Sequence, residues 1–191
     1  MSLIGSMAVA WPFAARAQQS ALPVIGYMDT ASASTTAHLV EAFRRGLSAA
    51  GYDEIRNVTI EYRWADGDYD KLPSLAADLV GRNVAVIATI NTPTILAAKA
   101  ATKTIPIVFA VGVDPIKFGL VESLNRPGGN LTGLTQLNVE IEAKQVQLLH
   151  DLAPSATTIA FLINPSSPPI ARLQQNRLRA RRAFLACACW S

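Results

Sequence analysis

Residues 84–111 read VAVIATINTPTILAAKAATKTIPIVFAV. The two ends of this stretch, 84–90 and 105–111, are almost entirely apolar, and an alanine-rich segment lies between them. Short apolar runs rich in β-branched residues are typical of buried strands, and the alanine-rich segment favours a helix over 94–102. Two buried strands joined by a helix form the crossover unit of a parallel sheet.

The same alternation continues in both directions along the chain. Apolar runs predict strands at 23–28, 58–64, 84–90, 105–111, 131–135 and 157–163. Apolar residues at helical spacing predict helices at 39–50, 72–80, 94–102, 117–124 and 141–152, with Asp70 as N-cap of the second. Because the strands are apolar throughout, we expect an α/β fold with a parallel sheet covered on both faces.

Composition excludes several classes of protein. The chain has 191 residues, of which 50% are hydrophobic and 16% charged, so a folded core is expected rather than disorder. No run approaches 18 consecutive apolar residues, so we expect no membrane-spanning segment. The net charge is +3, but residues 172–182 hold five arginines and no acid, which leaves 3 − 5 = −2 for the rest. We therefore expect no nucleic acid partner.

The N-terminus resembles an export signal that lacks its basic start. Residues 3–10 are apolar, and Ala15-Arg16-Ala17 has the small residues that precede a signal-peptidase cut, here after Ala17. No Lys or Arg precedes the apolar run, and a frayed apolar terminus is the alternative. We expect a periplasmic location if the signal is completed upstream, and a cytoplasmic one otherwise.

Polar side chains follow four of the predicted strands. In open parallel sheets, small ligands bind beyond the carboxyl ends of the strands. Hydroxyl, amide and carboxylate groups there can hydrogen-bond a small polar ligand. The candidate ligand-binding residues are Asp29, Thr30, Ser32, Asn91, Thr92, Val113, Asp114 and Asn164. Helices in any α/β fold also need polar caps, so capping alone is the alternative interpretation.

Other motifs favour structural roles over chemical ones. The run from Asp66 to Asp70 resembles the start of a calcium loop, but Lys71 stands where that loop needs Gly and Ala77 where it needs Glu. A solvated loop is the better interpretation. No glycine-rich phosphate loop follows a strand, and no serine lies in a nucleophile elbow. We expect no enzyme activity, no cofactor and no metal site.

Several blocks of sequence carry a resemblance to a known family. They are Ala42-Phe43-Arg44-Arg45-Gly46-Leu47, then the run NVTIEYRWA at 57–65, and above all IPIVF at 105–109 with GVDP at 112–115 and SLNRPGGNLTG at 123–133. From about Ala14 to Asn164 the chain is similar to the ABC-transporter substrate-binding family, which includes tryptophan-binding importer components. The resemblance implies two α/β lobes of the type I periplasmic-binding fold around a ligand cleft. It also implies an ABC permease and an ATPase as partners.

The resemblance assigns roles to the candidate residues. Asn91 and Thr92 would bind the carboxylate or other polar head of a small solute, helped by the helix that follows. Asp29 or Asp114 would meet an ammonium group if the solute is an amino acid. An enzyme of flavodoxin-like type, a ligand-sensing domain of the same fold and a non-functional product of a frame-shifted gene are the alternatives.

The family pattern weakens after about Ser167. We interpret residues 1–17 as a partial signal, 18–135 as the N-terminal lobe, 136–167 as the start of a second lobe and 168–191 as an aberrant basic tail that packs poorly. On this interpretation the binding protein is truncated and its ligand binding is impaired.

Overall fold

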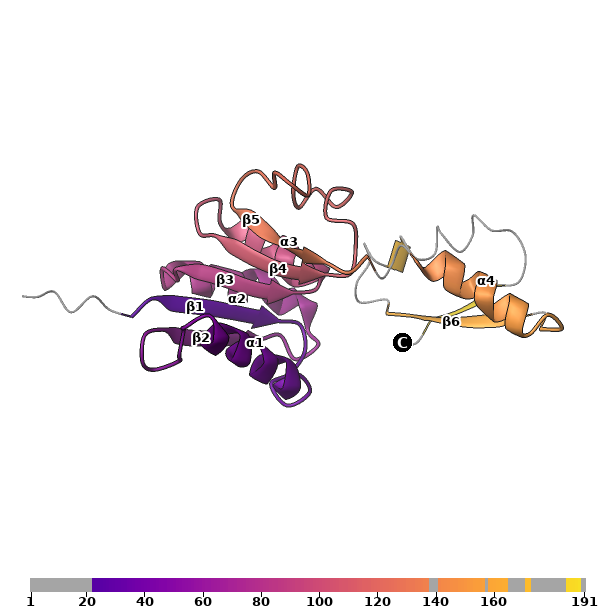
Figure 1. Ribbon diagram of the computed structural model, residues 1–191, viewed down its shortest axis with the longest axis horizontal. Coiled ribbons are helices and arrows are strands. Elements are labelled where there is room, and N and C mark those ends of the chain that lie inside the picture. The colour runs from indigo at the N-terminus through magenta and orange to yellow at the C-terminus, as the bar shows by residue number, and fades with distance from the viewer. Residues whose placement is uncertain (1–21, 138–140, 157, 165–170, 173–184, 190–191) are drawn as a thin grey trace, which may run out of the picture.

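The computed structural model describes residues 22–137, 141–156, 158–164, 171–172 and 185–189. Five parallel strands form one sheet in the order β2-β1-β3-β4-β5 (Figure 1). The strands are β1 (Val24–Asp29), β2 (Thr59–Trp64), β3 (Val86–Ile90), β4 (Ile107–Val111) and β5 (Leu131–Thr135). The predicted parallel α/β sheet is therefore confirmed, with every strand end within two residues of its predicted position.

Three helices cover the sheet. They are α1 (Ala37–Ala49), α2 (Leu72–Gly81) and α3 (Thr92–Ala101). Apolar side chains of α2 and α3 pack on one face of the sheet, whereas those of α1 pack on the other. This arrangement buries the two faces separately, as the apolar strands require.

Two local predictions are wrong. A short 3-10 helix (Tyr69–Lys71) precedes α2, and the carboxylate of Asp68 accepts the backbone N–H of Asp70 at 3.1 Å. Asp70 therefore lies inside this turn instead of capping α2. Residues 117–124 form turns and bends and not a helix, because Gly119 adopts φ 62° and the N–H of Glu122 bonds forward to the carbonyl of Pro127.

The larger core lies between the sheet and the α2–α3 layer. Its fully buried members Met28, Leu79, Ile87, Ile95 and Ile107 come from strands and helices alternately along the chain. Burying each of these side chains contributes about 1.5–3 kcal/mol relative to leaving it exposed.

A smaller core lies under α1 and is rich in aromatic rings. Tyr27 on β1 packs against Phe43 of α1 and against Tyr62 and Trp64 of β2, with ring centroids 5.3–5.7 Å apart. These separations fall in the favourable range for aromatic pairs.

Part of the sheet has no helix over it among the described residues. On the α1 side, α1 covers β1 and β2, while Val108 of β4 remains 44% exposed and Leu134 of β5 57% exposed. We refer to these two residues as the β4–β5 patch.

The outer edge of β2 is occupied by an arginine. The guanidinium of Arg63 donates to the backbone carbonyl of Tyr62 at 2.7 Å and forms ion pairs with Glu61 and Asp78. Asp78 belongs to α2, so Arg63 joins the edge strand to the helix packed behind it.

A second, smaller unit follows β5. It contains α4 (Glu142–Leu152), β6 (Ile159–Ile163) and β7 (Leu185–Cys189), and β6 pairs in parallel with β7. Figure 1 shows it beyond the end of the sheet where β5 terminates. The strand β7 lies inside the segment that we interpreted as an aberrant tail. The leader predicted at 1–17 lies outside the described residues. No helix in the described ranges is both long and apolar enough to span a membrane.

Candidate functional site

The strand order reverses at the carboxyl ends of β1 and β3, and we call this place the crevice. From β1 the chain crosses to β2 on one side, and from β3 it crosses to β4 on the other. The helices that follow, α1 and α3, lie on opposite faces of the sheet. The loops after β1 and β3 therefore leave in opposite directions, which is the position where open parallel sheets bind ligands.

Asp29, the last residue of β1, lies in this crevice with only 1% of its surface exposed. Its Oδ1 accepts the backbone N–H of Ala31 at 3.1 Å and the side-chain amide of Asn91 at 3.4 Å. Its Oδ2 is buried and makes no hydrogen bond of normal length and angle in the described part of the chain, although the Tyr27 phenol lies close enough to interact with this carboxylate. A buried carboxylate oxygen without a donor is costly, so this atom is suited to receive a donor from a ligand.

Asn91 fixes the other side of the crevice. It follows β3 with φ 64° and ψ 154°, a region that is essentially restricted to glycine. Its side-chain amide donates to the hydroxyl of Thr30 at 3.0 Å, and the hydroxyl of Thr94 donates to its backbone carbonyl at 2.9 Å. These bonds hold a strained backbone in place and tie the loop after β1 to the first turn of α3.

The N-terminus of α3 opens next to these groups. Thr92, its first residue, is buried, and no side chain caps the helix. Pro93 stands in the first turn and has no N–H, so the remaining amides of that turn provide the positive end of the helix dipole. An anionic group of a ligand is stabilised at such a position.

The negative charge of Asp29 also affects its neighbour Tyr27. Burial, and then the nearby Asp29 carboxylate, raises the pKa of Tyr27 to about 12. The phenol is therefore neutral at physiological pH. A side-chain hydrogen bond with Asp29 also contributes to this shift.

The other candidate carboxylate, that of Asp114, already has partners in its own loop. Oδ1 of Asp114 accepts the backbone N–H groups of Ile116 and Lys117, and its Oδ2 lies 3.4 Å from the ammonium of Lys117. Desolvation raises the pKa of Asp114, but these N–H groups and the Lys117 charge outweigh it, so the net shift is downward. Asp114 thus acts as a turn cap, which favours Asp29 as the group that meets a cation.

The remaining candidates are spread over three places. Val113 is 2% exposed and belongs to the core under α3. The hydroxyl of Ser32 contacts those of Ser34 and Thr35 within its own turn. The amide of Asn164, after β6, donates to the phenol of Tyr69 at 3.3 Å and so joins the second unit to the loop after β2.

Thr94 was missed by the sequence reasoning. Its hydroxyl contacts the backbone carbonyl of Ile90 and both oxygens of Asn91. The available signal was its position three residues after Asn91 at a helix start, where Thr commonly bonds backward. In the described ranges, no group of three or more His, Cys, Asp or Glu side chains is arranged so that it could hold a metal ion.

Comparison with known proteins identifies the class of protein that carries this crevice. Residues 25–183 match the profile of the family described as ABC transporter substrate binding protein. The chain belongs to this family. The match extends past Ser167, so the family pattern continues beyond the point where we expected it to weaken.

Individual relatives of this substrate binding protein agree with the assignment. A tyrosine-binding protein from Clostridioides difficile (strain R20291) is 35% identical over 127 residues, covering 66% of this chain and 36% of that protein. A conserved domain protein from Vibrio cholerae has 30% identity and a TM-score of 0.74, and an ABC domain from Streptococcus pneumonia in complex with L-Trp has 25% identity and a TM-score of 0.70.

The alignments cover most of this chain but little more than half of each solved relative. Each of the two structures aligns with 89% of this substrate binding protein, which spans 58% of their own length. The fold is also that of a leucine-binding protein from Thermotoga maritima, with a TM-score of 0.63 at 11% identity. The expected type I periplasmic-binding fold is therefore confirmed.

Proposed function

We propose that this chain supplies one wall of a cleft that captures a small solute, most suitably an aromatic amino acid, for an ABC importer. The observation that carries the proposal is the buried Oδ2 of Asp29, which makes no hydrogen bond of normal geometry among the described residues. An ammonium group placed there would both satisfy the oxygen and neutralise the carboxylate.

The second half of the recognition would come from α3. An amino acid bound by its ammonium at Asp29 would direct its carboxylate toward the uncapped first turn at Thr92. Asn91 spans the space between the two, because its side chain contacts both Asp29 and Thr30. The named ligands of the relatives, tyrosine and L-Trp, support an aromatic side chain.

The remaining parts of the proposal concern the whole protein. Binding proteins of this architecture enclose the ligand between two lobes, and each wall contributes to its burial. This chain spans about three fifths of its solved relatives, so we expect weak binding by this chain alone. An exported location and delivery to a membrane permease with its ATPase complete the proposed role.

Titration of the full chain with L-tryptophan, followed by amide chemical shifts, tests the proposal because it detects weak binding. We expect saturable shifts at 29–32 and 91–94. Asp29→Asn keeps the shape of the side chain but removes its charge, and should weaken binding about tenfold or more.

Two controls complete this experiment. Asp70→Asn changes an exposed carboxylate outside the crevice and should leave the affinity unchanged. Indole-3-propionate lacks only the ammonium and should produce no shifts at 29–32. Equal affinity of the wild-type and Asp29→Asn chains for L-tryptophan would contradict the proposed role of Asp29.

A further inference from the structure

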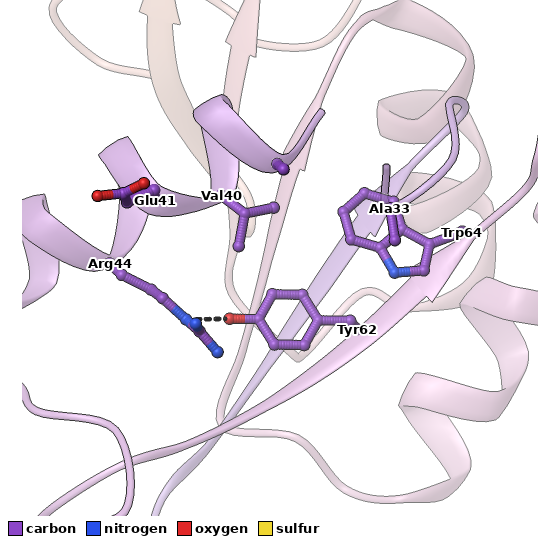
Figure 2. Close-up of a pocket in the computed structure, with 7 residues that line it drawn as sticks. Ala33, Val40, Glu41, Arg44, Tyr62 and Trp64 are labelled. Carbon is purple, nitrogen blue, oxygen red and sulfur yellow. Dashed lines mark hydrogen bonds between the residues drawn. The ribbon is translucent and has the colours of Figure 1, made fainter. Parts of the chain in front are cut away.

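A second hollow lies on the opposite side of the sheet from α3, between α1 and β2. Its volume is about 420 Å³, within the range of small-molecule sites. Figure 2 shows the residues that line it, which are Ala33, Ala37, Val40, Glu41, Arg44, Tyr62 and Trp64. None of these residues belongs to the crevice at Asp29.

Aromatic rings form one wall of this α1–β2 pocket. Tyr62 and Trp64 lie on the same face of β2, and their rings are nearly parallel, with an interplanar angle of 4° and a centroid separation of 6.1 Å. Opposite them, Ala33 and Ala37 contribute only methyl groups, which leaves the ring surfaces half-buried and the space between unfilled. Such a wall favours a ligand with a planar or large apolar group.

Arg44 provides a fixed positive charge at this pocket. Its Nε donates to the phenol oxygen of Tyr62 at 3.0 Å, and one terminal nitrogen pairs with Glu54 at 2.6 Å. The other terminal nitrogen has no partner among the described residues, and half of the side chain is exposed. Figure 2 shows the guanidinium directed at the Tyr62 hydroxyl, so its orientation is set before any ligand arrives.

Glu41 places a negative charge one helical turn before Arg44. Residues three apart on a helix are neighbours on its surface. One oxygen of Glu41 pairs with Arg45 at 3.0 Å in a highly exposed contact that contributes little stability, so the carboxylate can exchange partners. The pocket therefore combines an apolar aromatic wall with one cation and one anion at its rim.

We propose that the α1–β2 pocket is a second ligand site, which binds a zwitterionic amino acid with an aromatic or large apolar side chain. The carboxylate of the ligand pairs with Arg44, its ammonium with Glu41, and its side chain packs against Tyr62 and Trp64. A ligand with both charges pairs with both Arg44 and Glu41. A ligand with a single charge pairs with one of them and leaves the other, whose sign is the same as its own, unpaired.

The loop from β1 to α1 connects this pocket with the crevice. It begins at Asp29 and passes through Ala33 on its way to α1. The two sites thus share a connecting segment while using different side chains. The second site stands whether or not the crevice binds an amino acid.

The test follows the indole N–H signal of Trp64 in the full chain during titration with L-phenylalanine. The signal is assigned through Trp64→Phe, which separates it from Trp11 and Trp190. We expect a saturable shift. Phenylacetate and phenethylamine, each with one charge, should bind about tenfold more weakly or worse.

Variants separate the two sites and guard against unfolding. Ala37→Leu fills the pocket from an exposed helix position and should abolish the Trp64 shift, whereas Ala42→Leu makes the same change outside the pocket on α1 and should not. Asp29→Asn should remove shifts at 91–94 and leave those at Trp64. An unshifted Trp64 signal, or equal affinity for phenylacetate, would overturn the second site, and neither outcome bears on the crevice.

Discussion

A Cβ atom on Gly133 would lie 2.1 Å from the backbone carbonyl oxygen of Phe109 and 2.7 Å from its ring. Both contacts are well inside van der Waals distance, and the first involves backbone that cannot move without breaking the β4–β5 ladder. Gly133→Ala should therefore lower the free energy of unfolding by about 3 kcal/mol. Urea denaturation of the two chains measures the difference.

Gly46→Ala is the matched control for that measurement. Gly46 lies in α1, and a Cβ there would meet nothing within 4 Å. Because alanine is the better helix former, this variant should be more stable than the wild type by up to about 1 kcal/mol. Similar losses in both variants would show that the short approach to Phe109 has no structural cost.

The strained backbone of Asn91 predicts an unusual order of stabilities. With φ 64° and ψ 154°, this position suits glycine and disfavours any Cβ. Asn91→Ala and Asn91→Gly both lose the bond to Thr30, but only the alanine variant retains the strain. We expect the free energy of unfolding of the glycine variant to be at least about 1 kcal/mol higher than that of the alanine variant. The reverse order would mean that this backbone is unstrained.

Alkaline pH should weaken the fold through Tyr27. Its pKa is 10.0 in the unfolded chain and about 12 in the folded one. Below pH 10 both states are protonated and the contribution is fully present. Between pH 10 and 12 the unfolded state ionises first, so the free energy of unfolding decreases by roughly 2 kcal/mol. In Tyr27→Phe this decrease should be missing, and equal pH slopes in both chains would refute the assignment.

The β4–β5 patch predicts self-association of this chain. Val108 and Leu134 are exposed on a sheet face of a type that is normally covered, so contact between copies would bury them. Replacing both with threonine should reduce association in sedimentation velocity while changing stability by less than about 1 kcal/mol. Unchanged association would place the contact elsewhere.

Sequence reasoning succeeded for the sheet because its signal is local. Each strand is a short apolar run between loops, and each crossover helix repeats its apolar residues at a period of 3.6. The parallel order is then the expected one, since apolar strands joined by helices typically form crossover units whose strands run in the same direction. The helix predicted at 117–124 does not form, because Gly119 adopts φ 62° and the N–H of Glu122 bonds to the carbonyl of Pro127, which lies ahead of it in the chain.

The candidate site was only partly accessible from the sequence. Polar residues after β1 and β3 mark its position, but no pattern distinguishes Asp29 from Asp114. The difference lies in their partners. The carboxylate of Asp114 accepts hydrogen bonds from its own loop and pairs with Lys117, whereas Oδ2 of Asp29 is buried and makes no hydrogen bond of normal geometry in the described residues. The α1–β2 pocket was missed, because Glu41 and Tyr62 meet only once α1 is folded over β2.

The arginine at the edge of β2 determines how this sheet could be extended. By donating to the carbonyl of Tyr62, Arg63 occupies an acceptor that an incoming strand would need. At the opposite end of the sheet, β5 is the terminal strand of the ladder. Backbone pairing between copies would accordingly occur at β5, and because each lobe then offers one free edge, such pairing closes a dimer and does not continue into a fibre.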